Sequence, residues 1–155
     1  MAQEISNSDD VIDSRDVIQR IAELESEISA VGDEENPIAD ETATCGECGK
    51  SWNNATNPTP AARCPFEYVH AEIAELKTLQ ALASKAEGYS DWKYGATLIR
   101  DSYFEEYAQE LAEDIGATDK EQRWPLNHID WNAAAEELQG DYTSVEFDGV
   151  TYWIR

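Results

Sequence analysis

The spacing of the chain's three cysteines and one of its two histidines constrains the fold more than any other feature. The pattern is Cys45-x2-Cys48-x15-Cys64-x5-His70, in a chain of 155 residues. A Cys-x-x-Cys pair on a tight turn that contains glycine can place two thiolates on one tetrahedral ion, and a second ligand pair roughly 12–20 residues later completes the set. The sequence therefore predicts a Zn²⁺ site formed by Cys45, Cys48, Cys64 and His70.

Three thiolates and one imidazole leave no open coordination position for water, so the predicted site is structural and not hydrolytic. A redox or free-thiol role for the "CGEC" stretch is the alternative. A second alternative makes His70 an ordinary polar residue of a helix, because a ligand six residues after Cys64 requires an irregular helix start. An odd number of cysteines disfavours a disulfide framework.

Two apolar patterns predict a pair of helices on either side of the cysteine segment. A first helix, beginning at Asp9 or Ser14, has a heptad seam at Val17, Ile21, Leu24, Ile28 and Val31. A second helix, from Pro65 to about Glu87, has an apolar stripe at Val69, Ile73, Leu76, Leu79, Leu82 and Ala83. We expect the two helices to form a hairpin clasped by the cysteine loop. Pairing of the seam with a second copy, as a homodimer, is the alternative.

The predicted fold class is α+β, in three segments. Residues 1–13 are expected to be a flexible tail, residues 14–88 a helical hairpin with a zinc-ribbon-like loop, and residues 89–155 an acidic domain. Within the hairpin, residues 31–44 read as a charged linker and residues 53–62 as a loop.

The acidic domain is predicted to have β-α-α-β-β order and a small antiparallel sheet. We expect a strand at 95–100, a helix at 101–116 and a second helix between Asp130, as its N-cap, and Gly140. Alternating apolar residues on both sides of Asp148-Gly149 predict a terminal hairpin.

The charge of the chain bears on its partners. There are 33 acidic and 11 basic residues, for a net charge of −22. Residues 1–44 carry 13 acidic and 2 basic residues, residues 45–88 carry 5 and 4, and residues 89–155 carry 15 and 5. Such a field repels nucleic acid and anionic membranes, and it attracts basic surfaces such as nucleic-acid-binding clefts. A role of the charge in solubility alone is the simpler alternative.

The helix at 101–116 is the strongest candidate for contact with a basic partner. It has five carboxylates within about 14 Å, at about 1.5 Å per residue, and no Lys or Arg. Duplex DNA carries one negative charge per about 1.7 Å of axis, which this helix coarsely imitates. The candidate partner-binding residues, including two from the following helix, are Glu105, Glu106, Glu110, Glu113, Asp114, Glu136 and Glu137.

The sequence offers little support for catalysis. His128 and Asp130 form a general-base pattern but lack a credible nucleophile, and there is no glycine-rich phosphate loop. We therefore expect no enzymatic activity and read the surroundings of His128 as a packed corner. Four tryptophans are expected in the core: Trp92, Trp124, Trp131 and Trp153.

The chain is expected to be soluble and cytoplasmic. Its longest apolar runs are shorter than the roughly 18 residues that a membrane-spanning helix needs. The first residues, "MAQEISNSDD", are acidic and polar, unlike a secretory signal.

Several stretches are familiar together: "RDVIQRIAELESE", "CGECGKSW", "ARCPFEYVH", "TLIRDSYFEEYAQELAEDIG" and "WPLNHIDWNAAAEELQGDYTSVEFDGVTYWIR". They resemble a group of small acidic proteins of tailed bacteriophages and prophages, over most of the chain outside residues 32–42. The cysteine stretch also resembles short phage and actinobacterial zinc-ribbon-like proteins. The stretch "YFEEYAQELAEDIG" is more distantly similar to DNA-mimicking antirestriction proteins.

These resemblances imply a function. They point to a phage-encoded inhibitor of a host defence nuclease, of a CRISPR or restriction system. It would occupy the basic DNA-binding cleft of that nuclease as an acidic mimic of DNA, without binding nucleic acid itself. The alternative is a zinc-stabilised adaptor whose helical hairpin binds one host or phage protein.

Overall fold

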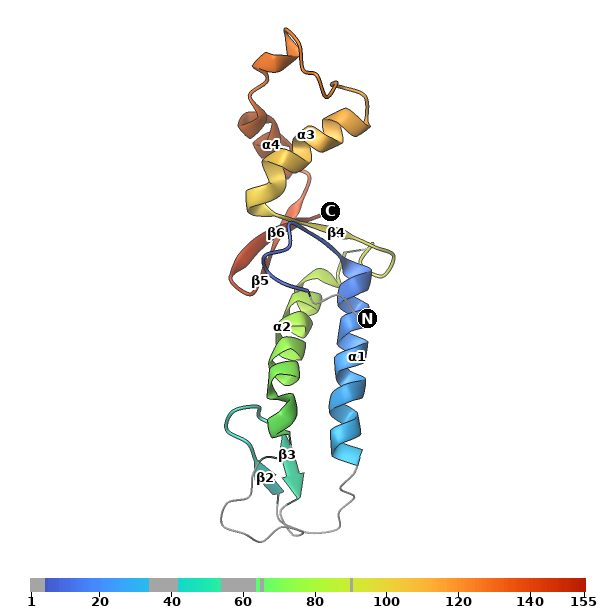
Figure 1. Ribbon diagram of the computed structural model, residues 1–155, viewed down its shortest axis with the longest axis vertical. Helices are drawn as coiled ribbons and strands as arrows, with labels where there is room; N and C mark the ends of the chain where they lie inside the picture. The colour runs from blue at the N-terminus through green and yellow to red at the C-terminus, as the bar shows by residue number, and fades with distance from the viewer. Residues whose placement is uncertain (1–4, 34–41, 54–63, 65, 90) are drawn as a thin grey trace.

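A four-stranded antiparallel sheet lies between two pairs of helices (Figure 1). The structure is a computed structural model, and it describes residues 5–33, 42–53, 64, 66–89 and 91–155. The elements are β1 (Val11–Asp13), α1 (Ser14–Asp33), β2 (Thr42–Thr44), β3 (Ser51–Asn53), α2 (His70–Ala86), β4 (Thr97–Arg100), α3 (Phe104–Asp114), α4 (Trp131–Gln139), β5 (Thr143–Phe147) and β6 (Val150–Ile154). Short 3-10 turns at Glu67–Val69, Asp101–Tyr103 and Leu126–His128 precede α2, α3 and α4.

The strand order in the sheet is β1-β4-β6-β5, and all pairings are antiparallel. Side chains alternate between the two faces along each strand. Leu98 and Ile99 of β4 therefore face opposite sides, and both are fully buried. A sheet that is covered on both faces explains this pair of adjacent buried apolar residues.

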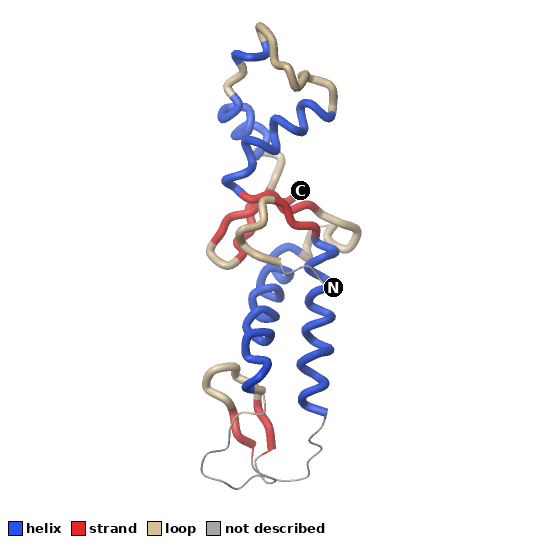
Figure 2. The backbone as a smooth tube through the Cα atoms, viewed as in Figure 1, coloured by secondary structure: helices blue, strands red, loops and turns tan. Residues whose placement is uncertain are grey.

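One face of the sheet packs on α1 and α2, which run side by side away from it (Figures 1 and 2). The seam of α1 lies against the apolar stripe of α2, as expected for a hairpin. Val17, Leu24 and Ile28 are buried, and Ile21 and Val31 are half-buried. The facing residues of α2 are Ile73, Leu76, Leu79 and Leu82, all buried. The heptad seam is thus used within one chain.

The opposite face of the sheet packs on α3 and α4. Its core consists of Ile99, Phe104, Ala108 and Ala135, with the half-buried Trp153 against it. The Phe104 ring meets the ring of Tyr142 edge to face, with centroids 5.2 Å apart. Such aromatic contacts stabilise a small core beyond its buried area.

The N-terminal segment differs from the predicted flexible tail. Residues Val11–Asp13 form an edge strand paired with β4, and both Ile5 and Ile12 are buried. The Tyr152 hydroxyl also donates a hydrogen bond to the Asp9 carbonyl oxygen at 2.6 Å. The segment binds the sheet, so the helical hairpin and the residues after 89 share one core. The predicted boundary at 88/89 does not separate two cores.

The remaining elements follow the predictions in part. The mixed composition of helices and strands and the antiparallel sheet are confirmed, and so is the terminal hairpin. The predicted Asp130 N-cap is confirmed too: its Oδ1 accepts a hydrogen bond from the Ala133 N–H at 3.1 Å. The expectation that all four tryptophans are core residues is wrong for Trp124, which is 78% exposed, while Trp92 is buried. His128 is exposed too, so the packed corner predicted around it is not found.

Two predicted connections lie largely outside the described residues: the charged linker, at residues 34–41, and the loop after the second cysteine, at residues 54–63. None of the described helices has the length and apolar character that crossing a membrane requires.

Candidate metal centre and acidic surface

The β2–β3 hairpin presents the first two cysteines on its turn, since Thr44 pairs with Ser51 on either side of it. The Cys45 N–H donates to the Lys50 carbonyl at 2.9 Å, and the Gly49 N–H donates to the Cys45 carbonyl at 2.9 Å. Gly49 has φ of +74°, a conformation that glycine adopts without the steric cost of a side chain. The turn therefore aims both thiols to one side.

The other two predicted ligands come from the start of α2. Cys64 precedes the 3-10 turn at Glu67–Val69, and His70 is the first residue of the α-helix. Val69 has φ of −121°, outside helical geometry. The helix thus begins irregularly and later than the predicted start at Pro65. This irregular start lets a cysteine and a histidine six residues apart face the same point.

The four side chains converge on one point, and three of their separations match those of a tetrahedral zinc site. All four ligand atoms lie within 4.8 Å of one another. Cys48 Sγ lies 3.7 Å from Cys64 Sγ, and His70 Nε2 lies 3.4 Å from Cys64 Sγ and 3.8 Å from Cys45 Sγ. Zn–S bonds of about 2.3 Å and Zn–N bonds of about 2.0 Å at tetrahedral angles give S···S and S···N separations of about 3.8 and 3.5 Å. The residues present therefore fit such an ion.

The surroundings orient two of the ligands. Glu47 Oε2 lies 3.3 Å from His70 Nδ1, which leaves Nε2 facing the sulfur atoms. A carboxylate on the outer nitrogen is the usual way to fix the tautomer of a metal-binding histidine. Lys77 Nζ donates to the Cys48 carbonyl oxygen at 2.6 Å, which ties the cysteine turn to α2.

The thiols differ in their electrostatics. Backbone N–H groups of Cys48 and Glu47 donate to Cys45 Sγ and lower the pKa of that thiol to about 7. Burial raises the pKa of the Cys64 thiol. A bound dication favours the thiolate form of every cysteine that ligates it. All three cysteines are free of disulfides, and the 3.7 Å between Cys48 and Cys64 far exceeds a disulfide bond of about 2.05 Å.

The structure brings together all four residues that the spacing predicted. The sequence reasoning missed the two supporting residues, Glu47 and Lys77. Both had a local signal: Glu47 lies inside the Cys-x-x-Cys pair, and Lys77 follows His70 by seven residues, which puts the two on one face of a helix.

The predicted partner-binding carboxylates lie on α3 and α4. Six of the seven are exposed, namely Glu105, Glu106, Glu110, Asp114, Glu136 and Glu137, and Glu113 is half-buried. On α3 they point away from the buried Phe104 and Ala108, which face the sheet. The Tyr103 hydroxyl donates to Glu110 at 2.8 Å, and this bond raises the pKa of Tyr103 to about 12. Within the described parts of the chain, no ion pair reaches these seven carboxylates.

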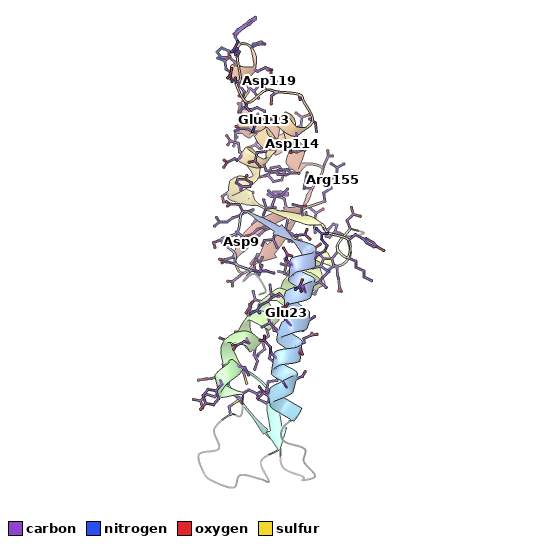
Figure 3. The ribbon with its side chains drawn as sticks, turned by 45° about the vertical axis from the view of Figure 1, so that its right-hand side comes forward. Asp9, Glu23, Glu113, Asp114, Asp119 and Arg155 are labelled. Atoms are coloured by element: carbon purple, nitrogen blue, oxygen red, sulfur yellow. The ribbon has the colours of Figure 1, made fainter. Side chains whose placement is uncertain are left out.

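Acidic side chains continue along the molecule (Figure 3). Asp119, Glu113 and Asp114 mark the α3 end, Asp9 lies beside the sheet, and Glu23 lies on α1. We define the α3 surface as Glu105, Glu106, Glu110, Glu113 and Asp114, because these five share one helix without a basic neighbour in it.

No protein-family model, no curated protein and no solved structure matches the chain. The similarity to phage proteins and to antirestriction proteins therefore stays a prediction.

Proposed function

We propose that Cys45, Cys48, Cys64 and His70 hold one structural Zn²⁺ ion. The observation that supports this proposal is the convergence of three sulfur atoms and one ring nitrogen within 4.8 Å of one another, with three separations of 3.4–3.8 Å that suit a tetrahedral ion. Four protein ligands fill the coordination sphere, so the ion stabilises the cysteine turn against α2 and does no chemistry on a substrate.

Metal analysis of the purified protein tests this site. We expect one zinc per chain in the wild type and none in His70→Ala. The matched variant His70→Cys supplies a fourth thiolate and should keep the zinc, because sites made of four cysteines are equally suited to the ion. If both variants keep the zinc, His70 is not a ligand.

We propose further that the protein is a non-enzymatic inhibitor whose α3 surface occupies the basic DNA-binding cleft of a host nuclease. The observation that supports this role is the solvent-facing row of carboxylates on α3, which has no cationic partner among the described residues. Like charges at i,i+4 spacing, such as Glu106 and Glu110, destabilise an isolated helix. A basic partner would neutralise these carboxylates and displace the counterions around them, as a DNA-binding protein does on DNA.

An adaptor that binds through the helical hairpin is less well supported. Its apolar seam already packs inside the chain, with Val17 and Leu24 fully buried and Ile28 nearly so. The exposed faces of α1 and α2 carry mainly polar and charged residues. The same packing leaves no free seam for a homodimer through α1.

Two triple variants of equal net charge test the α3 surface. Glu105→Gln/Glu106→Gln/Glu110→Gln removes three charges from α3, and Asp16→Asn/Glu25→Gln/Glu27→Gln removes three exposed charges from α1. Each variant is immobilised, and a bacterial protein fraction that was first selected by binding to a DNA column is passed over it. We expect the α3 variant to lose capture and the α1 variant to keep it. Equal capture by both would mean that net charge, and not the α3 surface, attracts the partner.

A further inference from the structure

The outer edge of β5 has backbone groups that no other described strand uses. β5 is the last strand in the order β1-β4-β6-β5 and pairs only with β6. Phe147 and Val150 flank a two-residue turn, so they form a hydrogen-bonded pair of the ladder. The N–H and C=O groups of Ser144 and Glu146 therefore point away from β6. In the described part of the chain, neither N–H has a backbone acceptor.

A groove follows this edge. A hollow of about 350 Å³ is lined by Lys85, Tyr89, Ser144, Val145, Glu146 and Thr151. The Lys85 ammonium lies 3.5 Å from the outward carbonyl oxygen of Glu146, which agrees with the direction derived from the ladder. The end of α2 thus forms one wall of the groove without covering the strand. β5 has neither a proline nor an irregular residue that would block pairing.

The charge around the outer edge of β5 determines which kind of strand can pair with it. From Glu136 to Ile154 the chain has five acidic residues and no Lys or Arg, and the basic residue that lines the groove, Lys85, comes from α2. A second copy of β5 would bring Glu146 of both copies to one short ladder, between two molecules that each carry a charge of −22. Like charges across a ladder destabilise it. A strand with basic side chains has the opposite effect.

We propose that β5 is a docking edge for an extended, basic segment of another protein, which adds to the sheet as a fifth strand beside β5. The segment's backbone would pair with the outward N–H and C=O groups of Ser144 and Glu146, and its N–H would replace the long contact of Lys85 with the Glu146 carbonyl oxygen. Its basic side chains would lie beside the exposed Glu146 and Thr151, on the face away from α1 and α2. This contact uses neither the zinc site nor the α3 surface, and it stands if the nuclease-inhibitor role fails.

Amide hydrogen exchange, followed by NMR, tests the proposal on the whole chain. The probe is an acetylated, amidated heptapeptide in which lysine alternates with valine. At about ten times its Kd, the peptide should slow exchange of the Ser144 and Glu146 amides about tenfold by mass action. A peptide of alternating lysine and proline has the same charge but cannot form a ladder. It should leave both amides unchanged.

A pair of variants checks the site. Ser144→Pro removes an outward N–H without loss of a ladder bond to β6, and the peptide should then no longer slow exchange of the remaining Glu146 amide. In Ser144→Ala the peptide should still slow that amide. Three results would overturn the proposal: equal binding of both peptides, no slowing of the two amides by the lysine–valine peptide, or slow exchange without peptide that depends on protein concentration. The last would assign the edge to a second copy of the chain.

Discussion

At the scale of single residues, Ser14 links two parts of the chain through three hydrogen bonds. Its hydroxyl is fully buried, donates to the Trp92 carbonyl oxygen at 2.7 Å and accepts from the Ala96 N–H at 2.7 Å. Its own N–H donates to the Ala96 carbonyl at 2.9 Å. This one side chain joins the start of α1 to the segment that enters β4, and it satisfies two buried backbone groups there.

Replacement of Ser14 by alanine should reduce the free energy of unfolding by about 1–3 kcal/mol, because it leaves a buried N–H and a buried C=O unpaired. Urea unfolding followed by circular dichroism measures the change. The control is Ser84→Ala, which removes an exposed hydroxyl and should change the free energy by less than about 0.5 kcal/mol. Similar losses for the two variants would refute the role of Ser14.

At the scale of elements, Arg20 and Glu75 fasten α1 to α2 next to their apolar contact. Arg20 Nε and one terminal nitrogen donate to the two Glu75 oxygens, both at 2.8 Å. The hydrogen bond to Glu75 raises the pKa of Arg20. The two side chains are only 19% and 26% exposed, so solvent screens the pair less than it screens a surface pair.

We expect Arg20→Ala to lower the free energy of unfolding by about 1–3 kcal/mol, since it removes two charge-assisted bonds and leaves a partly buried carboxylate. Arg15→Ala is the matched control: Arg15 also pairs with an aspartate, Asp13, but its side chain is 65% exposed. The control should lose less than about 1 kcal/mol. Thermal unfolding of both variants measures the two losses of free energy. An equal loss in Arg20→Ala and Arg15→Ala would contradict the coupling of the helices through Arg20.

Tyr152 connects the N-terminal segment to the sheet, and it predicts a pH dependence. Burial raises the pKa of this phenol to about 12, above its ordinary value of 10. A raised pKa means that the neutral form stabilises the fold below pH 10 and that this stability is lost as the pH rises from 10 towards 12. Urea unfolding between pH 9 and 12 should show this decline. Tyr152→Phe should make the decline shallower without removing it, because the raised pKa of Tyr103 contributes to it as well. Tyr94→Phe, at an 80% exposed site, should leave the decline unchanged.

The elements that the sequence predicted well have local, periodic signals. The seam of α1, the stripe of α2 and the Asp148-Gly149 turn each depend on residues close in sequence, and so does the metal spacing. β1 was missed because a three-residue strand is stable only through its partner: Val11 pairs with Ile99, which lies far along the chain. Trp124 was predicted wrongly as a core residue because amino-acid composition does not reveal which turns remain exposed in the fold.

At the scale of the whole molecule, the metal centre and the α3 surface lie at opposite ends of an elongated shape, with the sheet between them (Figure 1). A structural ion in the proposed zinc site would stabilise the elements that it joins, namely the β2–β3 hairpin and the start of α2. The sheet has its own apolar cores on both faces. Removal of the metal should therefore loosen the protein locally.

Chelation by EDTA should speed amide exchange near the metal centre, at the Cys45, Gly49 and Glu67 N–H groups, which bond within the cysteine turn and the 3-10 turn. The Arg100 N–H, which bonds to Asp10 in the sheet, should exchange at an unchanged rate. Readdition of zinc should restore the original pattern. A uniform increase at all four amides would mean that the ion stabilises the whole fold, and no increase at any of them would mean that the residues hold no metal.

The proposed inhibitor function depends on whether the α3 surface replaces DNA on a basic partner. The most direct measurement is elution of the captured bacterial protein from the immobilised chain, by duplex DNA at fixed salt and by a salt gradient without DNA. We predict release by duplex DNA, and release by salt with the steep dependence that counterion release produces. A partner that stays bound through both treatments would contradict mimicry of DNA by the α3 surface.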